Sequence, residues 1–164
     1  GAWDESKWTA WSDTKPGTGG AGVRCLGIEN LWANHWQFID GIKSDEQDLT
    51  SRKVYINNNP KTCDSSETTT NYTLLSYTRP ASGYGKHVGY DSTLPWCRIA
   101  DEVGGSTASY YADYSYSSTS AGWRCVVVGG SSDRGARSGL FSLGSPRVLS
   151  YSGADYGSRL LILS

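Results

Sequence analysis

The apolar residues of this chain occur in short runs separated by clusters of turn-forming residues, which argues against a fold built from long helices. Runs with the content of β-strands lie at Lys53–Ile56, Tyr72–Tyr77, Arg124–Val128 and Arg159–Leu163. Only 28–39 shows apolar residues at helical spacing, and its second half also alternates as a strand does. We therefore predict an α+β fold with a short helix that leads into a strand at Ile28–Ile39, and with extensive irregular loops.

Length and charge limit the organisation of the chain and its partners. Its 164 residues are typical of one domain, so we expect 1–164 to fold as a single unit. The net charge is −1, which gives no basic surface for nucleic acid. The apolar runs are far shorter than the ~20 residues that cross a bilayer. We expect neither nucleic-acid binding nor membrane insertion, and the sequence shows no targeting signal.

The residue types that carry common catalytic chemistry are scarce. The chain has two histidines, and it has neither the GxSxG nor the HExxH motif of common hydrolases. The glycine-rich segment 17–22 lacks the Lys-Ser/Thr ending of a phosphate-binding loop. The adjacent carboxylates Asp101 and Glu102 are more typical of a solvated turn than of a cation site. We therefore predict no catalytic residue, no cofactor and no metal ion.

The four cysteines are widely spaced and form no CxxC pair. Cys97 and Cys125 stand in apolar, strand-like surroundings, which favours buried thiols. A disulfide between these two residues is the alternative, because spacing alone does not decide it.

Residues 106–122 are rich in Tyr and Ser and poor in aliphatic residues. Antibody loops favour the same residues, because Tyr gives a large contact area at low entropic cost and Ser gives adaptable hydrogen bonds. The segment is therefore interpreted either as a contact surface or as a solvated loop.

Several motifs resemble those of phage and prophage proteins with a C-type lectin fold. The run Gly27–Gly41 reads GIENLWANHWQFIDG, close to the GIENLWGNxWxFxDG signature of that group. Segments 123–130, 135–141 and 156–161 resemble the pattern that closes the same domains, so the likeness spans residues 23–164. The resemblance implies a C-type lectin fold with small mixed sheets and short helices.

Within that group, the chain is most similar to the variable proteins of diversity-generating retroelements. In those proteins, mutation at adenines rewrites the 3′ end of the gene and thereby changes a ligand-binding surface. Such mutation of Asn codons cannot create Lys, Glu, Gln or Trp codons. These four residues occur 20 times in residues 1–128 and are absent from residues 129–164. The resemblance therefore implies a variable region at 129–159.

Glycines, Phe141 and Arg159 match the constant positions of the pattern, and the residues between them are candidates for ligand contact. Charged and tyrosine side chains there supply strong contacts, while serines leave an adaptable surface. The predicted ligand-binding residues are Ser131, Ser132, Asp133, Arg134, Arg137, Ser142, Ser145, Arg147, Ser150, Asp155 and Tyr156.

The chain is also similar to formylglycine-generating enzymes, but Leu160 stands after Gly157-Ser-Arg159 where those enzymes have a reactive cysteine. The resemblance thus implies a non-enzymatic module that binds a protein or cell-surface ligand, on a phage tail or a bacterial surface, with phage-tail or oligomer partners. A structural domain of a phage particle without an external ligand is the alternative. An enzyme related to the formylglycine-generating group is the third hypothesis.

Overall fold

A computed structural model describes residues 8–11, 22–25, 28–29, 32, 35–131, 133–154 and 156–157. Its strands are β1 (Trp8–Trp11), β2 (Gly22–Cys25), β3 (Ile28–Glu29), β4 (Trp36–Asp45), β5 (Lys53–Ile56), β6 (Thr73–Leu74), β7 (Gly83–Val88), β8 (Ala100–Val103), β9 (Tyr114–Ser117), β10 (Trp123–Val128), β11 (Leu143–Arg147) and β12 (Tyr156–Gly157). One 3-10 turn, η2, spans Gly135–Arg137.

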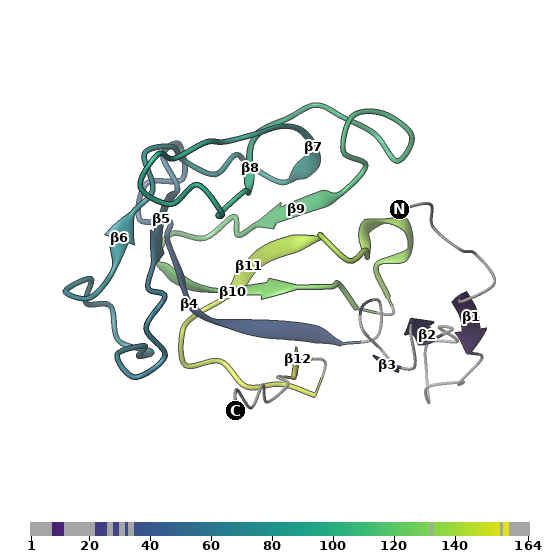
Figure 1. Ribbon diagram of the computed structural model, residues 1–164, viewed down its shortest axis with the longest axis horizontal. Coiled ribbons are helices and arrows are strands. Elements are labelled where there is room, and N and C mark those ends of the chain that lie inside the picture. The colour runs from purple at the N-terminus through teal and green to yellow at the C-terminus, as the bar shows by residue number, and fades with distance from the viewer. Residues whose placement is uncertain are drawn as a thin grey trace.

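Most of these strands belong to one curled, mixed sheet (Figure 1). Its order is β6-β5-β4-β10-β11-β9-β7-β8, and β12 pairs with β4 in parallel. The contact between β11 and β9 is also parallel, whereas β10 is antiparallel to both of its neighbours. Strands β1, β2 and β3 form a separate antiparallel sheet.

The expected α+β class, with short helices in a C-type lectin fold, is wrong: the described residues contain no α-helix. In the segment predicted as a short helix that leads into a strand, Ile28–Glu29 form β3 and no helix, whereas the strand half is confirmed because β4 begins at Trp36. The reason is that β4 has partners on both edges. Trp36 lies opposite Tyr156, and Phe38 lies opposite Val127. Packing of aromatic and β-branched residues across neighbouring strands stabilises β4 as a strand, and this stabilisation outweighs the helical spacing of its apolar residues.

The strand predictions have mixed outcomes. The strand at Lys53–Ile56 is confirmed, and that at 124–128 is confirmed with one more residue at its start. Of the strand predicted at 72–77, only Thr73–Leu74 is formed. The strand predicted at 159–163 lies outside the described residues. The Tyr- and Ser-rich segment is not loop throughout, because β9 lies inside it.

Two apolar clusters form the core. One contains six buried residues: Val54, Ile56, Leu75, Leu94, Cys97 and Ile99. The other contains Trp36, Cys125 and Val127, with Phe38, Leu149 and Tyr156 packed against it. Cys97 and Cys125 thus lie in different clusters as free, buried thiols, so the buried-thiol prediction is confirmed and the alternative disulfide is not formed. Burial raises the pKa of Cys125 to about 11, which keeps this thiol protonated at neutral pH.

Among the described residues, no helix is long and apolar enough to cross a membrane.

Candidate functional site

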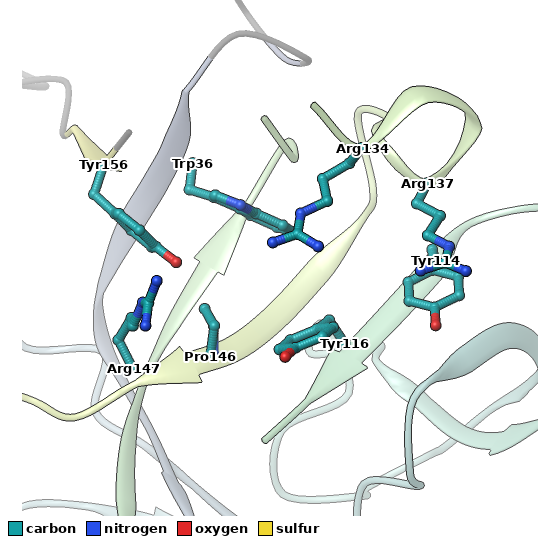
Figure 2. A pocket seen from close by; sticks show the side chains of 8 residues that line it. All are labelled: Trp36, Tyr114, Tyr116, Arg134, Arg137, Pro146, Arg147 and Tyr156. Carbon is teal, nitrogen blue, oxygen red and sulfur yellow. The ribbon is translucent and has the colours of Figure 1, made fainter. Parts of the chain in front are cut away.

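A small pocket lies where the C-terminal segments meet strands β4 and β9 (Figure 2). Its volume is about 90 Å³. It is lined by aromatic rings, one proline and guanidinium groups, namely by Trp36, Tyr114, Tyr116, Arg134, Arg137, Pro146, Arg147 and Tyr156. These residues come from segments far apart in the sequence, so the pocket depends on the folded sheet.

Pairing of β4 with β12 places two of the aromatic walls. Trp36 begins β4, and Tyr156 in β12 is its partner in the parallel register. The ring of Tyr156 stacks on Phe38 with a centroid distance of 5.4 Å. Trp36 is buried against Cys125 and Val127 and also lies close to Gly144, where a side chain would contact the indole ring. The indole is therefore fixed by the core while it lines the pocket.

Strand β9 supplies the opposite wall through its alternation. Tyr114 and Tyr116 face the pocket, while Ser115 and Ser117 between and beyond them are buried. Beneath the strand, the buried Arg79 donates hydrogen bonds to the Tyr116 carbonyl oxygen at 3.0 Å and to Ser115 Oγ at 3.3 Å. The two tyrosines thus project from a backbone that the interior holds in place.

The three pocket arginines each lie near a tyrosine ring. The guanidinium carbon of Arg137 is 4.9 Å from the ring centroid of Tyr114, and that of Arg134 is 6.0 Å from Tyr116. Arg147 lies 4.5 Å from Tyr151 and 5.9 Å from Tyr156. Such cation–π contacts are worth about 0.5–1 kcal/mol at exposed sites, so they orient the flexible arginine side chains.

Arginine is the only charged residue type in the lining of the pocket. None of its eight lining residues is an acid. The nearest described ion pair joins Arg134 Nε to Asp133 Oδ2 at 3.6 Å, and both side chains are about half exposed. A small site of arginines and aromatic rings favours hydrogen bonding to an anionic group and stacking against an apolar stem.

Four of the predicted ligand-binding residues line this one pocket: Arg134, Arg137, Arg147 and Tyr156. Asp133 is exposed and borders it through its ion pair with Arg134. Ser150 is exposed but is not part of the lining. Ser132 and Asp155 lie outside the described residues.

The remaining predicted contacts, Ser131, Ser142 and Ser145, are buried. Ser142 Oγ donates to the carbonyl oxygen of Arg137 at 2.8 Å, and Ser145 Oγ donates to the buried carboxylate of Glu46. The backbone carbonyl of Ser131 accepts a bond from Ser138 Oγ at 2.8 Å. These serines hold the loops together from inside, and sequence alone gave no sign that they point inward.

Sequence reasoning missed Trp36, Tyr114, Tyr116 and Pro146 as lining residues. Two of them lie in the Tyr- and Ser-rich segment, whose composition was the available signal for a contact surface. Trp36 gave no such signal, because a core tryptophan and a pocket tryptophan look alike in a sequence. Pro146 lies within the segment that the resemblance marks as variable.

The acidic pair expected in a solvated turn lies in strand β8 instead. Asp101 Oδ1 is 2.7 Å from Nδ1 of His87, and Glu102 pairs with Lys86. Both pairs cross from β8 to β7, so these groups link two neighbouring strands at the surface.

Comparison of the chain with protein-family models, curated proteins and solved structures gives no match. The likeness to retroelement variable proteins therefore rests on the motifs in the sequence.

Proposed function

We propose that this chain is a non-enzymatic ligand-binding protein whose C-terminal surface is diversified between copies of its gene, as in the variable proteins of retroelements. Its ligand is a protein or a cell-surface molecule. The motif resemblance supports this proposal, and so does the absence of Lys, Glu, Gln and Trp from residues 129–164. By the same resemblance, we place the protein on a phage tail or on a bacterial surface.

The observation that carries the proposal is the meeting of variable-region side chains at one pocket. Arg134, Arg137 and Arg147 are exposed, and with Tyr156 they line the same cavity (Figure 2). Arg and Tyr dominate the energetic centres of protein interfaces. Loops on a rigid scaffold accept changes of exposed side chains because their backbone bonds do not depend on side-chain identity.

A second candidate function, a structural domain of a phage particle, is favoured by a different surface. Phe141 and Tyr111 are exposed by 68% and 50%, and both line an apolar hollow beside β7 and β9. Exposed aromatic residues of this kind fit burial against a neighbouring subunit. A stable oligomer that covers Phe141 would support this alternative.

Saturation mutagenesis tests whether the pocket arginines are free to vary. We expect most substitutions of Arg134, Arg137 and Arg147 to change the free energy of unfolding by less than about 0.5 kcal/mol, because they are exposed. Substitutions of the buried Ser142 and Ser145 serve as the matched comparison, and we expect these to be destabilising. The measurement is protease resistance of a displayed library. Loss of folding on most arginine substitutions would contradict the proposal.

A further inference from the structure

We propose that the apolar hollow beside β7 and β9 binds the side chain of a Lys residue from a protein partner, with its ammonium group beside Asp113. Tyr114 lines both the hollow and the pocket, but Arg134, Arg137 and Arg147 do not line the hollow. The inference therefore does not depend on the proposed function. Its support comes from charge, from the chemistry of the walls, from the backbone that positions them and from size.

The first support is the state of the one carboxylate in the lining. Asp113 is partly buried. Burial raises the pKa of Asp113, and neither a hydrogen bond nor a charge from the described residues counters this effect. Asp64 and Asp91 differ, because hydrogen bonds from Lys43 and Thr93 lower the pKa of these two groups. A ligand cation beside Asp113 would stabilise the charged form of its carboxylate.

Arg98 also lines the hollow, but its guanidinium group has other partners. The guanidinium carbon lies 4.5 Å from the ring centroid of Tyr90, and Nη1 donates a hydrogen bond to the carbonyl oxygen of Gly89 at 3.3 Å. Neither Tyr90 nor Gly89 is part of the lining. Of the two charged residues of the hollow, Asp113 is therefore the one whose charge has no partner among the described residues.

The second support is the combination of aromatic and aliphatic walls. Tyr111, Tyr114 and Phe141 line the hollow, and the faces of such rings attract an ammonium group. Val88 and Leu143 add aliphatic surface, along which Lys can bury its methylene stem. Tyr111 and Phe141 are exposed by 50% and 68%, so a protein partner can contact them while its Lys side chain enters the hollow.

The third support is the backbone that places Tyr111 and Asp113. The residues before and after Tyr111 have positive φ, of +56° at Tyr110 and +55° at Ala112. This conformation is unfavourable for residues with a side chain, and such strain clusters at ligand-binding sites. The carbonyl oxygen of Asp113 accepts a hydrogen bond from the N–H of Gly85 in β7 at 2.9 Å. This bond fixes the end of the strained loop to the sheet.

The fourth support is size. The volume of the hollow is about 280 Å³, the space of about nine water molecules in the liquid at about 30 Å³ each. A Lys side chain can therefore enter together with its stem. A bare metal ion or a free ammonium ion would leave most of this volume and the apolar walls without a partner.

The test is an NMR titration that follows the backbone amide signals of Tyr111, Asp113 and Leu143. The probe is N-acetyl-lysine N-methylamide, and the uncharged probe of nearly the same shape carries a methyl group in place of the ammonium. We expect saturable shifts with the Lys probe and at least tenfold weaker binding of the methyl probe. Asp113→Asn is expected to weaken binding of the Lys probe about tenfold, because the charge-assisted contact is lost.

Phe141→Ala tests the aromatic wall separately and keeps the carboxylate. Phe141 is exposed, so we expect its replacement to leave the fold intact. Binding of the Lys probe is expected to weaken about twofold to fivefold, through the loss of one cation–π contact. This variant decides the matter even if Asp113→Asn does not fold.

Glu67→Gln is the matched control. Glu67 is exposed and does not line the hollow, so this change removes one negative charge from the surface alone. Binding of the Lys probe is expected to remain unchanged. Well-dispersed spectra of each variant show that it is folded.

Several results would overturn the proposal. They are the absence of saturable shifts with the Lys probe, equal or tighter binding of the methyl probe, an equal loss in Glu67→Gln, and tighter binding of the Arg or Glu counterpart of the probe. A preference for the Glu counterpart that Arg98→Ala abolishes would assign the hollow to an anion bound by Arg98.

Discussion

Replacing Glu46 with Gln is expected to lower the free energy of unfolding by about 3–5 kcal/mol, which is the usual cost of breaking a buried ion pair by removing one partner. The Glu46 carboxylate is completely buried and lies 3.6 Å from Arg52 Nε and 3.7 Å from Arg79 Nη1. Glutamine keeps the size of the side chain but removes the only negative charge in this group of three. Two buried guanidinium groups would then remain without a counter-ion.

The charge itself is what matters in this network. Neither arginine atom of the two ion pairs has a hydrogen-bond partner, and Glu46 Oε2 has none either. Burial lowers the pKa of Arg79 to about 10 and nearby Glu46 opposes this shift, so Arg79 remains charged at neutral pH. Electrostatic attraction to Glu46 in these two ion pairs therefore compensates for the burial of the arginines away from water.

The same network supports the pocket from below. Ser145 in β11 donates to Glu46, and Arg79 binds the backbone of β9 at Tyr116. Loss of the carboxylate is therefore expected to disturb the contact between β9 and β11 as well as the overall stability. Urea denaturation measures the loss of stability, and the indole signal of Trp36 reports on the pocket.

Glu102→Gln is the matched control for this prediction. Glu102 pairs with Lys86, but both side chains are exposed by 53% and 39%. Exposed ion pairs contribute about 0–1 kcal/mol, so this variant is expected to unfold near the parent. Equal destabilisation by Glu46→Gln and Glu102→Gln would refute the importance of the buried carboxylate.

Replacing Gly130 with Ala is expected to lower the free energy of unfolding by about 1–3 kcal/mol from backbone strain, and further because of a collision. Gly130 has a φ of +77°, a conformation that costs a residue with a side chain about this much. In addition, a Cβ there would lie 2.4 Å from Ser138 Oγ and 2.7 Å from Ser138 Cα. This turn follows β10 and leads into the loop that carries Arg134 and Arg137, so the loop would have to move.

Gly135→Ala separates the two causes. Gly135 also has a positive φ, of +53°, but a Cβ there would meet nothing within 4 Å. This control carries the backbone strain without the collision, so a smaller loss of stability is expected. Thermal unfolding of the two variants gives the comparison. A loss in Gly135→Ala as large as that in Gly130→Ala would mean that contact with Ser138 has no effect.

Local patterns predicted the strands that are apolar and bounded by turns, such as Lys53–Ile56, because burial and period-two alternation act within a few residues. They failed for the helix predicted in the first half of 28–39, while the strand in the second half formed; the outcome there depends on partners from β10 and β12 that lie about 90–120 positions away. Helical spacing and strand alternation overlapped there, and long-range pairing decided between them. This information is absent from any single window of sequence.

The candidate site was predictable in part for a similar reason. Charged residues in the segment that the motifs predict to vary, such as Arg137 and Arg147, are exposed as their chemistry demands. Serine has no such preference for exposure. Ser145 is buried, and its hydroxyl donates a hydrogen bond to the carboxylate of Glu46, which follows β4 and lies 99 positions earlier in the chain. Trp36 reaches the pocket through the pairing of β4 with both β10 and β12. The pocket forms only when these distant segments come together in the folded chain, so no local sequence motif predicts it.

Deep sequencing of the 3′ end of this gene and its flanking DNA, in a population of the source organism, tests the diversified binding surface most directly. We predict variation at adenine-derived codons, concentrated at Arg134, Arg137, Arg147 and Tyr156, with Gly130 constant and a near-identical template repeat nearby. An invariant 3′ end without a repeat would contradict a diversified surface and would favour the structural domain of a phage particle.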